Sequence, residues 1–152
     1  MKLKEPYTDI NRVLECIIYQ VNDSINYCIE NLPSFSTPEQ MFNILKMNVT
    51  YHLDPKGTEL IQSVPTLFNN NYWGVSGSGD CDCFTVLTLA CCYANGWNDN
   101  EIILKGKSSK APSHIYSAVN TNGKKYTLDL TNRYINEERY YPLTQTIKLK
   151  TK

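Results

Sequence analysis

Hydrophobic residues recur at every third or fourth position over residues 10–32, and this spacing predicts one long amphipathic helix. The stripe consists of Ile10, Val13, Leu14, Ile17, Ile18, Val21, Ile25, Ile29 and Leu32. Thr8 or Asp9 can cap its start, and Pro33 marks its end. A second helix is predicted from Thr37 to about Asn48. Its start combines an N-cap threonine, a proline at the first helical position and a glutamine that completes a capping box.

The pattern changes after the second helix. Residues 49–80 are punctuated by proline, glycine and asparagine, and we expect a long loop with little regular structure. A loop of this length in a small domain tends to be functional. Residues 81–95 are apolar on nearly all sides, which predicts a central, buried helix, and Gly96 suits the position just past its end.

After Gly96, apolar and polar residues alternate with a period of two. This alternation predicts strands at residues 101–105, 114–119 and 125–130, and an additional edge strand at 147–149. The turn at residues 120–123 favours a hairpin. Helices followed by an antiparallel sheet indicate a single α+β domain. We divide it into a helical N-terminal part (1–48), a long loop (49–80), a catalytic-type core (81–132) and a C-terminal segment (133–152).

Charge and composition narrow the classes of function. The chain has 152 residues, with 15 Lys and Arg against 15 Asp and Glu, and this neutrality argues against nucleic-acid or membrane-surface binding. No apolar run is long enough for a membrane helix, and residues 1–6 lack the apolar core of a secretory signal. We therefore expect a cytoplasmic location.

The six cysteines are expected to be free thiols, since no secretory signal is visible. Cys16 and Cys28 fall on or beside the first apolar stripe, which indicates packing. The other four lie at 81, 83, 91 and 92. On a helix they would point in different directions and span about 15 Å, so they could not easily converge on one tetrahedral zinc ion. We expect no metal site.

Cys81 is expected at the N-terminus of the buried helix, after a glycine-rich approach at residues 76–80. Unpaired N–H groups and the helix dipole favour a thiolate there and could stabilise an oxyanion. Such a nucleophile needs a base, and the chain has two histidines, His52 and His114. His114 opens a predicted strand, and Asp129 lies near the end of the next one, where neighbouring side chains face each other. Cys81, His114 and Asp129 thus form a candidate catalytic triad.

These segments resemble the transglutaminase-like superfamily, whose members share a papain-like core. The corresponding stretches are Gly79-Asp80-Cys81-Asp82-Cys83-Phe84, His114-Ile115-Tyr116 and Leu128-Asp129. The resemblance covers roughly residues 48–132, and residues 49–61 are similar to the lead-in of a variant found in bacteriophage structural proteins. It implies that Cys81 is the nucleophile, His114 the base and Asp129 the acid that orients the base.

The chain departs from the family pattern at two positions. Cys83 replaces the second aspartate after the nucleophile, and Tyr116 replaces the usual tryptophan. Gln62 and Trp73 lie upstream, but neither has a spacing that assigns the oxyanion partner. We expect His52 to be a loop residue without a catalytic role.

The leading expectation for function is cysteine-dependent acyl chemistry on an amide, through a thioester that water or an amine resolves. This describes a peptidase, an amidase or a transglutaminase, with a protein or peptide substrate and no cofactor. The alternative is a virion structural protein of a tail or neck assembly. It would bind other virion proteins and keep the triad idle or use it only in maturation.

Overall fold

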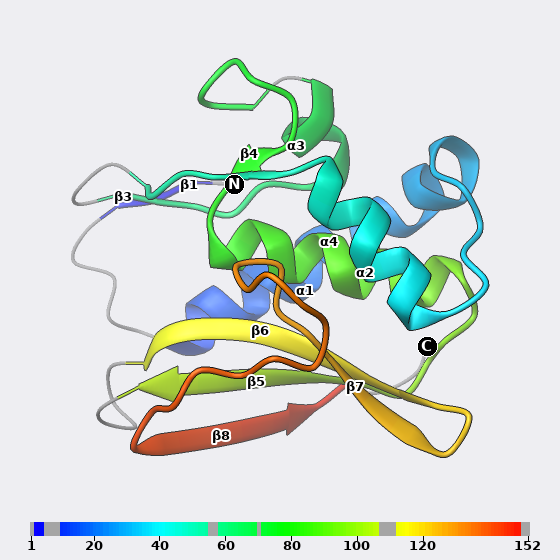
Figure 1. The fold of residues 1–152 in the computed structure, drawn as a ribbon. Helices are drawn as coiled ribbons and strands as arrows, with labels where there is room; N and C mark the ends of the chain where they lie inside the picture. The colour runs from blue at the N-terminus through cyan, green and yellow to red at the C-terminus, as the bar shows by residue number, and fades with distance from the viewer. Residues whose placement is uncertain (1, 5–9, 55–57, 70, 107–111, 150–152) are drawn as a thin grey trace.

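An antiparallel four-stranded sheet and one buried helix form the centre of the protein (Figure 1). The computed structural model describes residues 2–4, 10–54, 58–69, 71–106 and 112–149. The sheet has the order β7-β6-β5-β8. Its strands are β5 (Asn100–Gly106), β6 (Pro112–Thr121), β7 (Lys124–Leu128) and β8 (Leu143–Lys148). The helices are α1 (Ile10–Asn31), α2 (Pro38–Met47), α3 (Val64–Asn69) and α4 (Cys81–Ala94). The expected α+β class is confirmed.

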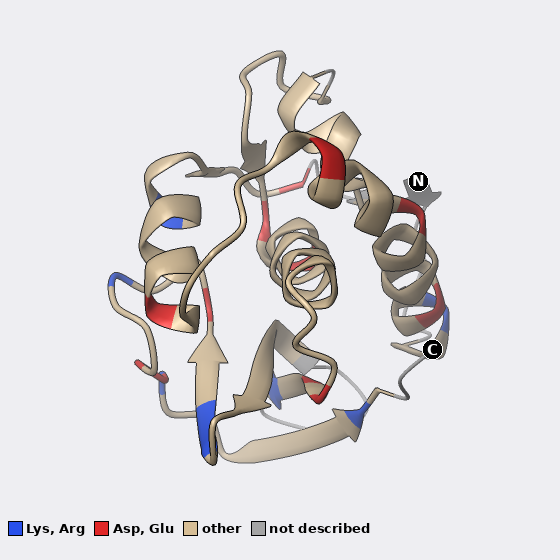
Figure 2. Ribbon diagram, turned by 90° about the vertical axis from the view of Figure 1, so that its right-hand side faces the viewer, with Lys and Arg blue, Asp and Glu red and all other residues tan. Residues whose placement is uncertain are grey.

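The helix α4 is central because its sequence is apolar on all sides. Every residue from Asp82 to Cys92 is buried. It packs against α1 and α3 and lies on β5 and β6 of the sheet, where Thr88 Oγ1 is 2.7 Å from Ser117 Oγ. Figure 2 shows it in the middle of the molecule, with helices on both sides and the sheet below. The position of its N-terminus is therefore fixed by the core of the protein.

The two N-terminal helices have nearly the predicted bounds. Thr37 caps α2 by accepting a hydrogen bond from Gln40 N at 3.1 Å. The glutamine side chain reaches back to Ser36 N at 2.7 Å, one residue before the expected partner. Thr8 and Asp9, the predicted caps of α1, lie outside the described residues.

The expectation of an irregular loop at residues 49–80 was wrong in part. This stretch contains α3 and three short strands, β2 (Thr50–Tyr51), β3 (Thr58–Leu60) and β4 (Ser78–Gly79). The strand β2 pairs in parallel with β4, and β3 pairs with β1 (Lys2–Lys4). Gly77 permits the first pairing, because its φ is +83° and a Cβ there would collide with the carbonyl oxygen of Asn48.

The predicted hairpin between β6 and β7 is confirmed. Asn122 and Gly123 both have positive φ, which is typical of the tight turns that join antiparallel strands. The predicted edge strand is β8, which begins earlier than expected. The strand predicted at residues 125–130 ends at Leu128, so Asp129 follows β7 instead of lying within it. Among the described residues, no helix is long and apolar enough to cross a membrane.

Candidate active site

Cys81 is the first residue of α4 and is separated from the short strand β4 by a single residue, Asp80. The chain passes close to the first turn of α4 before the helix begins, and this close approach requires Gly79. A Cβ at that position would lie 2.8 Å from Cys83 Cβ. The Cys81 side chain is half-buried, whereas Cys83 is only 1% exposed. The sequence thus placed the candidate nucleophile correctly at the N-terminus of the buried helix.

The helix terminus is more negative than expected. Asp80 is the N-cap, and its carboxylate accepts a hydrogen bond from Asp82 N at 3.2 Å. Asp82 Oδ1 lies 3.9 Å from Cys81 Sγ. Carboxylate oxygens of Asp54, Asp80 and Asp82 lie within 4.8 Å of one another. Such oxygens suit a hard cation, and without one their charge opposes a thiolate on Cys81.

The same negative charge affects Tyr51, which lies on β2. Burial, together with the charges of Cys81 and the neighbouring aspartates, raises the pKa of Tyr51 to about 12. Its ring packs edge-on against Phe84 in the first turn of α4, with a centroid separation of 6.2 Å. Tyr51 therefore lies close to the candidate nucleophile and keeps its phenolic proton near neutral pH.

His114 and Asp129 form the predicted pair. His114 Nε2 lies 2.6 Å from Asp129 Oδ2, and the two side chains are 8% and 2% exposed. The rest of the carboxylate is also bonded. Thr131 donates to Oδ1 from its backbone N at 3.1 Å and from its hydroxyl at 2.7 Å. Asn132 Nδ2 donates to Oδ2 at 3.2 Å. These donors hold the carboxylate in one orientation toward the imidazole.

Two tyrosines pack against the imidazole ring. The Tyr141 ring is stacked on His114 at a centroid separation of 6.0 Å, and the Tyr116 ring is tilted at 5.5 Å. The Tyr116 hydroxyl donates to Glu138 Oε1 at 2.5 Å. Burial and this carboxylate raise the pKa of Tyr116 well above its usual value. Two aromatic rings thus flank the imidazole of His114.

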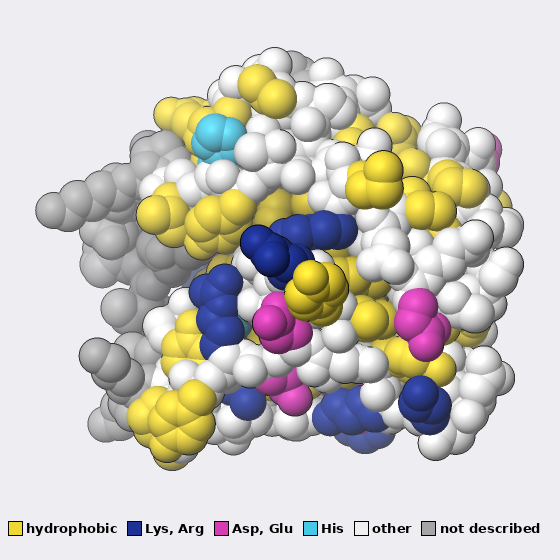
Figure 3. Space-filling model, in the orientation of Figure 1, with side chains coloured by type: hydrophobic (Ala, Val, Ile, Leu, Met, Phe, Trp, Pro, Cys, Tyr) yellow, Lys and Arg dark blue, Asp and Glu magenta, His cyan; other side chains and the backbone are white. Residues whose placement is uncertain are grey.

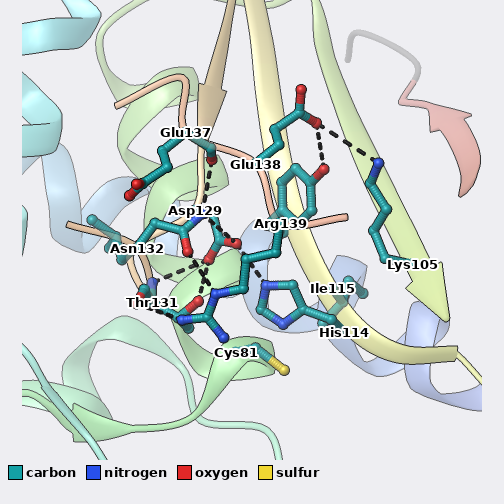
Figure 4. A network of polar contacts seen from close by, with 12 residues as sticks. Cys81, Lys105, His114, Ile115, Asp129, Thr131, Asn132, Glu137, Glu138 and Arg139 are labelled. Carbon is teal, nitrogen blue, oxygen red and sulfur yellow. Dashed lines mark hydrogen bonds and ion pairs between the residues drawn. The ribbon is translucent and has the colours of Figure 1, made fainter. Parts of the chain in front are cut away.

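The start of α4 lies near the start of β6. Thr85 Oγ1 is 3.4 Å from the carbonyl oxygen of Ile115. Cys81 is one helical turn before Thr85, and its carbonyl oxygen accepts the same hydroxyl at 2.8 Å. His114 directly precedes Ile115. Figure 4 shows Cys81 at the end of the helix, below the His114 ring.

His114 lies in the part of β6 that extends past its pairing with β7. His114 lies on the same face of β6 as Tyr116, whereas Ile115 belongs to the core beneath α4. The strand β7 ends at Leu128, opposite Ser117. Beyond this pair, the described residues provide no strand next to β6 on that side. Among the described residues, His114 therefore lies beside an open edge of β6.

The remaining residues singled out in the sequence have structural contacts. The Cys83 thiol donates to Leu60 O at 3.1 Å, and Gln62 Nε2 donates to Ser78 O at 3.0 Å. Cys83 is therefore packed beneath the helix terminus. His52 follows β2 and stacks on Trp73 at a centroid separation of 5.4 Å.

The sequence analysis missed the loop that follows Asp129. Thr131, Asn132, Arg139 and Tyr141 surround the His114–Asp129 pair, yet they fall at and beyond the end of the predicted catalytic-type core. Polar residues in a loop carry no periodicity. The available signal was the Asp-Leu-Thr-Asn run at residues 129–132, which is typical of a turn in which the aspartate side chain accepts backbone N–H groups.

In comparisons with known proteins, no family model matches the chain, and no curated protein or solved structure matches it either. The resemblance to the transglutaminase-like superfamily therefore rests on the motif residues and stays a prediction.

Proposed function

We propose that this chain catalyses cysteine-dependent acyl chemistry on an amide, with Cys81 as nucleophile, His114 as base and Asp129 as the residue that orients the base. The observation that carries the proposal is the buried His114–Asp129 contact of 2.6 Å, close to the N-terminus of the helix that begins with Cys81. A buried histidine paired with a carboxylate is typical of proton-transfer sites.

The pairing selects which ring nitrogen can serve the thiol. Because Nε2 of His114 contacts Asp129, proton exchange with Cys81 has to use Nδ1. The imidazolium that forms is then stabilised by the carboxylate. Since three aspartates crowd the helix terminus, we assign most of the stabilisation of the thiolate to His114 and less to the helix dipole.

The environments of the other cysteines favour selective reaction at Cys81. Burial raises the pKa of the thiols of Cys16, Cys83 and Cys92. The hydrogen bond to Cys28 and burial raise that of Cys91. Buried thiols that remain protonated are poor nucleophiles.

The proposed reaction proceeds in two steps. The Cys81 thiol gives its proton to Nδ1 of His114, and the sulfur attacks the amide carbonyl carbon. The C–N bond breaks, and the amine leaves with the proton from the imidazolium, so a thioester remains. Water or a second amine, deprotonated by His114, then attacks the thioester carbonyl and releases the acid or the new amide together with the Cys81 thiol.

We further propose that the α+β architecture is a papain-like core. The support is the order of its parts along the chain: a buried helix that begins at the candidate nucleophile, then a strand that carries the base, then an acid directly after the next strand. The N-terminal helix α1 packs against α4.

The test is the rate at which iodoacetamide alkylates each cysteine near neutral pH, measured by mass spectrometry of peptides. Cys81 is expected to react faster than the five other cysteines, and His114→Ala should slow it about tenfold or more. The matched control is His52→Ala, which removes the other imidazole and should leave the rate unchanged. A wild-type Cys81 that reacts no faster than in His114→Ala would refute the proposal and leave the domain as a structural module.

A further inference from the structure

A chain of hydrogen bonds continues behind the His114–Asp129 pair into the loop that follows β7 (Figure 4). Asn132 Nδ2 donates to Asp129 Oδ2 at 3.2 Å and to Glu137 O at 2.7 Å. Asn132 Oδ1 accepts a hydrogen bond from Arg139 Nε at 2.9 Å. A guanidinium on the surface is therefore connected to the imidazole through one amide and one carboxylate.

The Asn132 amide has one permitted orientation. Its nitrogen faces two acceptors, Asp129 Oδ2 and Glu137 O, and its oxygen faces a donor, Arg139 Nε. A rotation by 180° would place the amide oxygen against two oxygens and the amide nitrogen against a guanidinium. The side chain is 4% exposed, so water could not replace the lost partners.

Arg139 donates hydrogen bonds to two of the residues that hold Asp129. Besides Asn132, its guanidinium donates to Thr131 O at 3.3 Å. Its side chain is exposed. Figure 3 shows basic and acidic side chains gathered near the middle of one face of the molecule. Lys46 adds a second cation nearby and donates to Leu130 O at 2.7 Å. Because Leu130 directly follows Asp129, this hydrogen bond holds Lys46 beside the same loop.

We propose that Asn132 and Arg139 are positioning residues that hold the Asp129 carboxylate, and through it the His114 ring, in the orientation needed for proton exchange with Cys81. The inference rests on the proposed function. Thr131 fixes only Oδ1 of Asp129, so Oδ2, which contacts His114, depends on Asn132 for its second bond. Arg139 acts through Asn132 by fixing its amide.

The experiment uses the full chain with Asn132→Ala, Arg139→Met and Arg139→Lys. The matched control is Asn95→Ala, which also removes an amide with two hydrogen bonds, at the opposite end of α4. The first readout is the pH profile of Cys81 alkylation by iodoacetamide. We expect Asn132→Ala to lower the rate about tenfold at neutral pH and to flatten the profile toward that of His114→Ala. Both Arg139 variants should show a smaller loss, about threefold, because lysine keeps the charge but cannot bridge two acceptors. Asn95→Ala should keep the wild-type profile.

The second readout is the exchange rate of the His114 ring N–H with solvent, measured by NMR, which reports on positioning whether or not Cys81 is reactive. Asn132→Ala and Arg139→Met should accelerate this exchange, and Asn95→Ala should not. An unchanged exchange rate in Asn132→Ala would overturn the inference. Arg139→Met replaces an exposed side chain and keeps the test decisive if Asn132→Ala does not fold. A wild-type protein with slow ring exchange but an unreactive Cys81 would instead refute the proposed function alone.

Discussion

The carboxylate of Asp82 should suppress the reactivity of the proposed nucleophile, and removing its charge should increase that reactivity. Asp82 Oδ1 lies 3.9 Å from Cys81 Sγ. At this separation, two unit charges repel each other by about 1 kcal/mol in water and by about 4 kcal/mol at an effective dielectric constant of about 20. Because Cys81 is half-buried, the applicable value lies between these limits.

The substitution Asp82→Asn keeps the shape of the side chain and removes the charge. A stabilisation of the thiolate by about 1.4 kcal/mol corresponds to one pH unit, so the midpoint of the alkylation profile should move to lower pH by roughly one unit or more. The assay is the rate of Cys81 modification by iodoacetamide from pH 5 to pH 9. The fold should be retained, since asparagine is tolerated in a first helical turn.

The control for this prediction is Asp99→Asn, which removes a carboxylate that is 60% exposed and paired with Lys148 on the sheet. It should leave the profile of Cys81 unchanged. A midpoint that stays in place or moves to higher pH in Asp82→Asn would show that this carboxylate does not oppose the thiolate, and the electrostatic account of the site would be wrong.

Three further predictions concern stability. Cys83→Ser should lower the free energy of unfolding by about 1 kcal/mol in urea titrations and leave alkylation of the nucleophile unchanged, because the thiol is buried and hydrogen-bonded to Leu60 O and Gln62 Nε2. Gly77→Ala should be destabilised by several kcal/mol in the same assay, through its positive φ and the collision with Asn48 O. Glu101 is buried, which alone would raise its pKa, but hydrogen bonds from two lysines and an amide lower that pKa to about 2. Since its unfolded value is about 4.3, the stability that Glu101 adds over Glu101→Gln should be full above about pH 5 and disappear as the pH falls toward 2.

The longest elements could be predicted from the sequence because each shows its hydrophobic pattern over many residues. The first helix shows a full apolar stripe, and α4 is recognisable from its length and all-round apolarity. The strands β2 and β4 could not be predicted, since two residues cannot display a period. Their pairing depends on Gly77, whose conformation matters only once residues 48 and 77 are brought together.

The candidate site could be predicted in part, for a related reason. Cys81, His114 and Asp129 each mark the start or end of an element, so their order along the chain carries information. Asp54 and Asn132 do not mark the start or end of a helix or strand. The pairing of β2 with β4 brings Asp54 to the helix terminus, and the hydrogen bonds of the loop bring Asn132 to Asp129. Contacts of this kind follow from tertiary structure and leave no pattern in the sequence.

The nucleophile and the orienting carboxylate of the proposed site are held by parts of the structure that differ in stability. Cys81 begins a helix whose residues fill the core, so displacing that helix means unfolding the protein. The Asp129 carboxylate is held by a surface loop in which residues 136–140 are exposed and the bonds join mainly neighbours within the loop. Segments with few buried apolar contacts open locally at a free energy below that of global unfolding. Heat or mild denaturant would therefore loosen the carboxylate that orients His114 while α4 and β6 stay in place, so inactivation of this site would precede denaturation of the domain.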